Sequence, residues 1–292
     1  MKQTMSMQIF TDSSANLFEE QVKALKLEIV SLTLSINEDE VLCYEPGIPF
    51  DLNGFYARMR QDDKLELRTS MINTEAFLTA FEPFLQAGTD ILYLAMSAAL
   101  SGTWSGGQTA AEILKKKYPL RKIRVVDTNS ATIGEGMMVR EAVAMRDAGV
   151  ALDEIADHVE RRKHEIRQYF MVDDLNFLKR GGRLSNSAAM AGSIMHLKPI
   201  LKGDEEGRIV LDRKLFGRKK AINTLIDIFR QEHVDKPENS SIGISHTGVE
   251  DEAHLLAAEI IDRYPNIKAE IVPFEPCTSS HVGPGALGLF FF

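Results

Sequence analysis

The sequence has little of what marks several common classes of protein. Only two of its 292 residues are cysteines, Cys43 and Cys277, and their positions match no metal-ligating or redox motif. We therefore expect free thiols in a reducing, cytoplasmic setting. The net charge is −8 at pH 7, which argues against nucleic acid as a partner, because phosphate contacts require a basic face. No apolar run approaches the roughly 18 residues of a membrane span, and the first ten residues hold no long apolar segment of a signal peptide.

Several catalytic and cofactor motifs are also missing. The chain has no G-x-x-x-x-G-K-[ST] loop for nucleotide phosphates and no H-E-x-x-H or similar spacing for a metal, so we expect neither a cofactor nor a metal ion. A serine hydrolase of the α/β type requires G-x-S-x-G at a strand-to-helix turn, and GTWSGG at 102–107 misses this pattern by one position. His246 and His281 could still act as bases, so a serine hydrolase acting on a small ester or lipid remains the alternative function.

Strand-like and helix-like patterns alternate through the first half of the chain. The continuous apolar run DILYLAM at 90–96 is typical of a parallel strand buried on both faces. The expected strands are 7–12, 28–36, 90–96 and 122–128, and the expected helices are 13–27, 73–88, 102–119 and 135–149. This order predicts βαβ units around a mainly parallel sheet.

The second half also mixes strands and helices. The expected helices are 151–166, an Ala/Met-rich one within 176–201, 218–232 and 250–264, and the expected strands are 167–175, 207–216, 241–247 and 267–276. We therefore predict an α/β fold with two lobes. Residues 1–160 form an N-terminal lobe with a mainly parallel sheet and flanking helices, and residues 161–292 form a C-terminal α/β lobe with a mixed sheet.

The segment GPGALG at 283–288 is a literal G-x-G-x-x-G. A dinucleotide loop of this kind requires a strand before it and a helix after it, but only four apolar residues follow here. We instead predict a tight loop that leads into a short buried strand, with His281 at the mouth of the loop.

Hydroxyl-rich segments lie at several junctions next to the predicted helices. They are 11–16, 68–70, 97–107 and 128–136. Helix capping explains any one of them, because Ser, Thr, Asn and Asp satisfy the free N–H groups of a helix start. Four in one half of the chain suggest a pocket of neutral donors and helix N-termini that favours an anion. Few positive charges lie in these loops, so a carboxylate fits better than a polyphosphate.

Two arginines flank a pair of glycines in LKRGGRLS at 178–185. The glycines predict a tight turn that presents Arg180 and Arg183. This turn is either a solvated loop or a place where a guanidinium reaches a phosphate or a partner carboxylate.

Seven segments occur in one order along the chain. They are IFTDSSANL (9–17), TS (69–70), MSAALSGTWSGG (96–107), VVDTNSATIGEG (125–136), VDDLNFLKRGGRLS (172–185), LKPIL (197–201) and HVGPGALGLFF (281–291). This ordered set resembles the DegV family of bacterial fatty-acid-binding proteins, which includes the acyl-carrier subunits of fatty acid kinase. The resemblance covers about residues 9–292.

The resemblance implies two α/β lobes with a long-chain fatty acid, such as palmitate, stearate or oleate, buried between them. It implies no catalysis by this chain alone. The protein is expected to take up the acyl chain during transient contact with a membrane surface or from other pools. It then presents the carboxylate to a fatty acid kinase catalytic subunit, which forms the acyl-phosphate.

The resemblance also assigns roles to residues. Thr69 and a serine of the block at 97–103 hold the carboxylate, and the choice between Ser97 and Ser101 stays open because the usual second serine of that block is Ala98. His281 faces the head group. The candidate ligand-binding residues are Thr69, Ser97, Ser101, His281, Gly283, Ser13 and Thr128, and the candidate residues facing the partner or its phosphate are Arg183 and Arg180.

Overall fold

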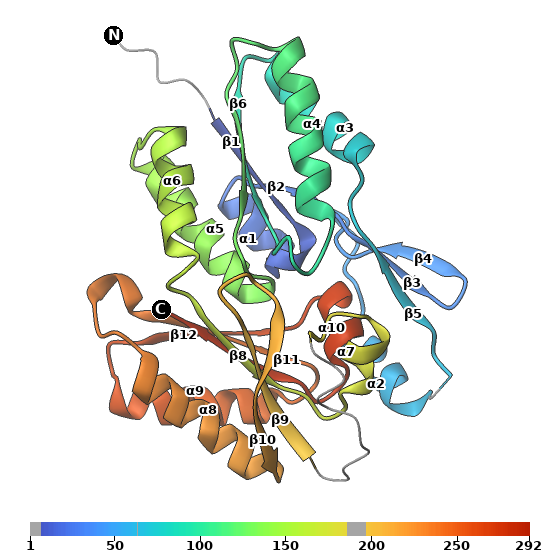
Figure 1. Ribbon diagram of the computed structural model, residues 1–292, viewed down its shortest axis with the longest axis vertical. Helices are drawn as coiled ribbons and strands as arrows, with labels where there is room; N and C mark the ends of the chain where they lie inside the picture. Colours follow the sequence, from blue (N-terminus) through green and yellow to red (C-terminus); the bar gives the residue numbers. More distant parts are fainter. Residues whose placement is uncertain (1–6, 63, 186–196) are drawn as a thin grey trace.

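A computed structural model describes residues 7–62, 64–185 and 197–292 of the chain (Figure 1). Two sheets lie one above the other in this view, and helices cover their outer faces. Residues 186–196, part of the range 176–201 in which the Ala/Met-rich helix is predicted, lie outside the described residues. No helix in the described part of the chain has the length and apolar character needed to cross a membrane.

The first sheet is wholly parallel, as predicted, with strand order β2-β1-β6-β7. Its strands are β1 (Met7–Asp12), β2 (Glu28–Val30), β6 (Asp90–Ala95) and β7 (Ile123–Asp127). The helices α3 (Thr74–Gln86) and α4 (Thr103–Lys117) cover one face. The helices α1 (Glu19–Ala24), α5 (Thr132–Asp147) and α6 (Leu152–Arg162) pack on the other. Every residue of β6 is buried, because helices shield this central strand on both sides.

A small antiparallel sheet lies beside the first one, with order β4-β3-β5. It consists of β3 (Thr33–Ile36), β4 (Asp39–Leu42) and β5 (Leu67–Ser70), and α2 (Leu52–Gln61) connects β4 to β5. The single β segment predicted at 28–36 is therefore two strands in two sheets. Asn37, in the left-handed region at φ 57°, makes the turn of the β3–β4 hairpin.

The C-terminal sheet is mixed, as predicted, with order β10-β9-β8-β13-β11-β12. Its strands are β8 (Arg167–Met171), β9 (Leu197–Gly203), β10 (Ile209–Phe216), β11 (Ser241–His246), β12 (Lys268–Pro273) and β13 (Leu287–Phe291). Only β11 and β12 pair in parallel. The helices α8 (Arg218–Glu232) and α9 (Glu250–Arg263) cover its outer face.

Helix α5 lies between the two large sheets and contacts strands of both. One hydrophobic core contains Ile9 of β1, Met138 of α5, and Phe170 and Phe290 of the C-terminal sheet. The boundary near residue 160 stays a prediction, since residues from both sides of it share this core.

The chain crosses back toward the first half after β12. The predicted strand at 267–276 ends at Pro273, and Pro276 begins α10 (Pro276–Val282), which contacts α2, α7 (Asn176–Arg180), β3 and β5. The tight loop predicted after His281 follows, with Gly283 and Gly285 at φ 74° and 84°. It leads into β13, whose five residues are all buried.

Candidate functional site

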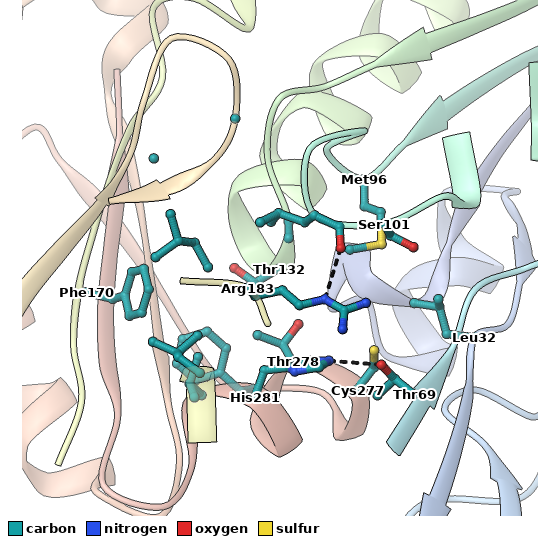
Figure 2. A pocket seen from close by; sticks show the side chains of 18 of the residues that line it. Leu32, Thr69, Met96, Ser101, Thr132, Phe170, Arg183, Cys277, Thr278 and His281 are labelled. Carbon is teal, nitrogen blue, oxygen red and sulfur yellow. Dashed lines mark hydrogen bonds between the residues drawn. The ribbon is translucent and has the colours of Figure 1, made fainter. Parts of the chain in front are cut away.

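A largely apolar cavity lies where the two halves of the chain meet. It contains about 850 Å³ of space free of protein atoms, part of it open to solvent. Its polar lining residues include Thr69, Ser101, Arg183, Thr278 and His281. Figure 2 shows Phe170 on the side of the cavity away from Thr69 and Ser101. The apolar lining includes Leu32, Met96, Leu100, Phe170, Leu178, Ile209, Phe274 and Phe290.

Thr69 and His281 form a pair at the polar side of the cavity. Thr69 comes from β5 and His281 from the last turn of α10, and the Thr69 hydroxyl lies 2.9 Å from His281 Nε2. Burial, and then the positive charge of Arg183, lower the pKa of His281 to about 4, so the imidazole is neutral at neutral pH. In the tautomer with its proton on Nε2, the ring donates to Thr69 Oγ1 and leaves the threonine O–H to donate to a ligand.

The other side of the imidazole packs against the Gly-Gly turn. A Cβ atom at Gly181 would lie 2.2 Å from His281 Nδ1. The ring can therefore occupy its place only because residue 181 has no side chain. This contact connects the LKRGGRLS segment directly to the candidate head-group site.

Arg183 lines the cavity, whereas Arg180 does not. Arg183 Nε donates to the carbonyl oxygen of Leu100 at 3.1 Å, and Nη1 donates to that of Gly181 at 2.5 Å. These bonds use two of the five N–H groups of a guanidinium. Arg180 is exposed, and its guanidinium lies 4.7 Å from the ring centre of Phe177.

The structure brings Ser101, and not Ser97, to the cavity. The Ser101 hydroxyl lies 2.9 Å from that of Thr103 and accepts the Thr103 N–H at the start of α4. Ser97 is fully buried, and its hydroxyl donates to the carbonyl oxygen of Gly207 at 2.9 Å. Ser97 thus joins the β6–α4 loop to the turn between β9 and β10.

Three further candidates also lie outside the cavity lining. Ser13 Oγ accepts the N–H of Leu32, and Thr128 Oγ1 donates to the carbonyl oxygen of Ala95. These bonds hold loops, but neither of them caps a helix. Gly283 adopts a positive φ where α10 turns into β13.

Two threonines that the sequence analysis did not single out, Thr132 and Thr278, line the cavity. Thr278 precedes His281 by three positions on α10, so both side chains lie on one face of the helix. That spacing could have identified Thr278 if the segment had been assigned as a helix. Thr132 is buried at φ 58°, an unusual backbone conformation for a β-branched residue. Its hydroxyl has no hydrogen-bond partner among the described residues.

Buried acids hold the loops beneath the cavity. Asp12 at the end of β1 accepts the N–H of Met96 at 3.0 Å and the hydroxyl of Tyr93 at 2.9 Å. Glu135 of α5 accepts the hydroxyls of Ser14 and Thr11. Burial raises the pKa of both carboxyl groups, and the charge of Asp12 raises that of Glu135 further. This network links β1, β6 and α5 below the site.

The arrangement differs from that of a serine hydrolase. A nucleophilic serine requires a base within hydrogen-bond reach. Within residues 7–62, 64–185 and 197–292, no serine hydroxyl bonds to a histidine, and His281 pairs with Thr69 instead.

Comparison with known proteins identifies the family. The family model described as an uncharacterised protein of the DegV family matches residues 6–292. A DegV domain-containing protein of Clostridium perfringens is 37% identical over 286 residues, which are 97% of this chain and 96% of the relative.

Two solved structures share the fold at 26% identity, and each comparison covers 99% of both chains. One is the fatty-acid-binding DegV family protein of Thermus thermophilus, with a TM-score of 0.87. The other is DegV of Bacillus subtilis, described as a fatty acid binding protein, with a TM-score of 0.85. The chain therefore belongs to the DegV family.

Proposed function

We propose that this protein binds one long-chain fatty acid, such as palmitate, stearate or oleate, in the cavity and presents its carboxylate to a fatty acid kinase subunit. The observation that carries the proposal is an apolar cavity whose polar groups include Thr69, Ser101, Thr278, Arg183 and a neutral His281. Relatives with this fold are described as fatty-acid-binding proteins. The chain itself acts as a carrier in the cytoplasm and needs no cofactor.

The apolar lining supplies most of the affinity. A sixteen-carbon chain that buries about 15 carbons gains on the order of 12 kcal/mol, at about 0.8 kcal/mol per CH₂. Association and ordering subtract several kcal/mol or more. A hydrogen bond to the carboxylate adds about 1.5–3 kcal/mol. The tail therefore determines whether the ligand binds, and the hydroxyls and His281 determine its orientation.

A surface hollow beside the cavity supports the kinase step. It shares His281 with the cavity and is also lined by Lys64, Arg68 and Arg180, and by one acid, Glu66, which pairs with Arg68. A carboxylate at His281 would lie next to a basic surface to which a partner can bring ATP. Transfer of the phosphoryl group then takes place at the contact between the two proteins. A transient contact with a membrane surface completes the cycle by supplying the acyl chain.

A chain-length series tests the proposal. The delipidated protein is titrated with saturated fatty acids of increasing length and with the methyl ester of the tightest binder. We expect affinity to rise about fourfold per CH₂ until the cavity is filled, following about 0.8 kcal/mol per CH₂, and to fall for the ester. No dependence on chain length would refute the lipid site. Acyl-phosphate should form only when the protein, the kinase subunit, ATP and the fatty acid are all present.

A further inference from the structure

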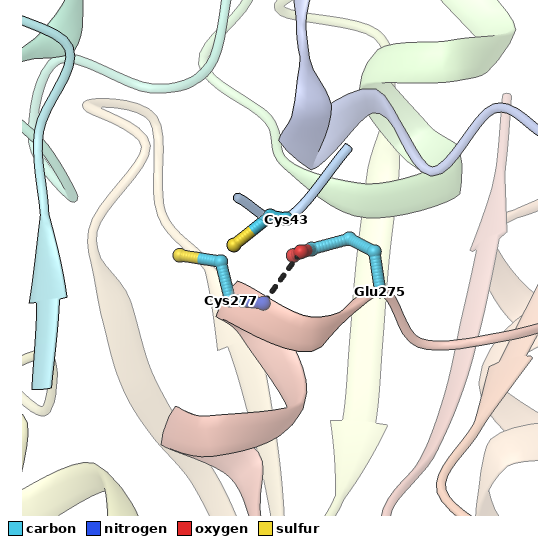
Figure 3. Close-up of side chains that lie close together, drawn as sticks. All are labelled: Cys43, Glu275 and Cys277. Atoms are coloured by element: carbon cyan, nitrogen blue, oxygen red, sulfur yellow. Dashed lines mark hydrogen bonds between the residues drawn. The ribbon is translucent and has the colours of Figure 1, made fainter. Parts of the chain in front are cut away.

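Two segments that are far apart in the sequence bring two thiols and a carboxylate together. Cys43 directly follows β4, whereas Glu275 and Cys277 lie at the start of α10. The two Sγ atoms and a carboxylate oxygen lie within 4.8 Å of one another. Figure 3 shows the three side chains gathered at the first turn of α10. All three residues are buried, with exposures of 7%, 6% and 5% for Cys43, Glu275 and Cys277.

Hydrogen bonds hold the carboxylate in place without using all of its lone pairs. Glu275 caps α10, and its two oxygens accept the N–H groups of Cys277 and Thr278 at 2.6 and 2.5 Å. Asn16 Oδ1 accepts the N–H of Glu275 at 2.9 Å. Each carboxylate oxygen has a second lone pair, so the capping bonds leave Glu275 able to bind a cation.

The cluster lies between two hollows, which provide an entry path. Cys277 lines the fatty-acid cavity. Cys43 and Glu275 line a second hollow of about 790 Å³ with some space open to solvent, together with Asn16 and Phe50. A small ion can therefore reach the cluster from the outer hollow even when the cavity is filled.

We propose that Cys43, Glu275 and Cys277 bind a divalent cation of the zinc class through two thiolates and one carboxylate oxygen. Thiolates favour zinc over the harder magnesium and calcium ions, and three protein ligands leave a fourth position for water or another small ligand. Each thiol gives its proton to solvent when the thiolate binds the metal. Buried anionic ligands are costly without a counter-charge, and the cation supplies it.

The ion would connect the end of β4 to α10, the helix that carries Thr278 and His281. Any change in lipid affinity on binding of the ion would rest on the proposed function, whereas the binding of the ion itself does not. The two can therefore be tested separately.

Cobalt serves as the probe, because Co²⁺ occupies zinc sites and is coloured. The full-length, delipidated and reduced protein is titrated with Co²⁺ while its absorption spectrum is recorded, and Zn²⁺ is then added. We expect one equivalent of Co²⁺, thiolate-to-cobalt charge-transfer bands, a visible spectrum typical of four-coordination, and loss of both on addition of Zn²⁺.

Substitutions of the ligands should weaken this binding. In Cys43→Ser and Cys277→Ser we expect the affinity to fall by more than about 100-fold, beyond what loss of a supporting group around a metal usually costs. Glu275→Gln keeps an oxygen that can cap α10 and should also weaken binding. Glu45→Gln changes an exposed residue of the same outer hollow and should bind as the wild type does. Circular dichroism of each variant checks its folding.

Three results would overturn the site. The first is the absence of a thiolate-to-cobalt band in the wild-type protein, and the second is an unchanged affinity of Cys43→Ser for Co²⁺. The third is a Cys43–Cys277 disulfide that forms under mild peroxide at the same rate with and without Zn²⁺. Because no fatty acid is present in the titration, failure of the metal site leaves the proposed lipid site untouched. Failure of the chain-length series would likewise leave the metal site untouched.

Discussion

Thr69 and His281 lie 212 positions apart in the sequence, and their side chains meet at 2.9 Å in the cavity. Each is held by a different part of the fold, Thr69 by the β3–β5 pairing and His281 by α10. The contact exists only when α10 packs against the small antiparallel sheet. The proposed head-group site therefore depends on tertiary packing.

Removal of a hydroxyl from this site should weaken fatty-acid binding. Thr69→Val and Ser101→Ala each remove one proposed hydrogen bond to the carboxylate. Such a bond is worth about 1.5–3 kcal/mol, so we expect about a 10- to 100-fold loss of affinity. Displacement of a fluorescent fatty acid by palmitate measures this loss. Thr224→Val, on the exposed side of α8, is the matched control, and equal affinities in all four proteins would contradict the assignment.

The neutral state of His281 should make stability depend on pH. The pKa of His281 is about 4 in the folded protein, against an ordinary value of 6.5. As the pH falls below 6.5 the unfolded chain takes up this proton first, so the free energy of unfolding falls until about pH 4. This residue contributes up to ~3 kcal/mol to that loss, at 1.36 kcal/mol per pKa unit. Urea unfolding should show a smaller loss between pH 7 and 4.5 in His281→Asn. An identical loss would contradict the neutral, buried ring.

A bound fatty acid should raise the pKa of His281. A carboxylate beside the ring favours the imidazolium and opposes the effects of burial and of Arg183. NMR titration of the histidine ring protons, with and without palmitate, measures this shift, and His281→Asn assigns the signal. A pKa that does not move on binding would place the carboxylate elsewhere.

Two adjacent glycines should differ in what their substitution does. Gly181→Ala places a Cβ 2.2 Å from His281 Nδ1, so we expect the ring to move and palmitate affinity to fall at least about tenfold, the cost of one hydrogen bond. Gly182 is at φ 69° with nothing within 4 Å of its added Cβ. Gly182→Ala should therefore lower stability by about 1 kcal/mol through backbone strain and leave affinity unchanged. The reverse pattern would contradict the role of Gly181.

The backbone of Thr132 predicts a stabilising substitution. A β-branched residue at φ 58° carries strain on the order of 1–3 kcal/mol, and its buried hydroxyl has no partner among the described residues. Thr132→Gly removes the backbone strain and the unpartnered hydroxyl. It also gives the unfolded chain more backbone entropy, which lowers stability. We expect thermal unfolding to show a net gain of about 1 kcal/mol. A clear loss of stability would mean that the side chain packs usefully in the cavity wall.

The sequence predicted the two large sheets better than it predicted the site. The apolar run of β6 and the helices around it indicate a parallel sheet, because only burial on both faces permits such a strand. The pattern at 28–36 does not reveal that β2 and β3 belong to different sheets, since strand partners are chosen by distant residues. The start of α10 at Pro276 is also hidden, because Pro suits a loop as well as a first helical turn.

The choice between Ser97 and Ser101 also depends on a distant contact that the sequence does not reveal. Both hydroxyls lie in one loop and both could bind a carboxylate. Ser97 turns away because its hydroxyl bonds to Gly207, 110 positions later in the chain. The metal-site proposal rests on the same kind of distant contact, between Cys43 and α10.

Native mass spectrometry of the purified protein, followed by denaturing extraction and lipid analysis, tests the central claim most directly. The account predicts one bound species per chain with the mass of a long-chain fatty acid, released on denaturation, either in the protein as purified or after addition of palmitate. A protein that carries no such species and takes up neither palmitate nor oleate would contradict it.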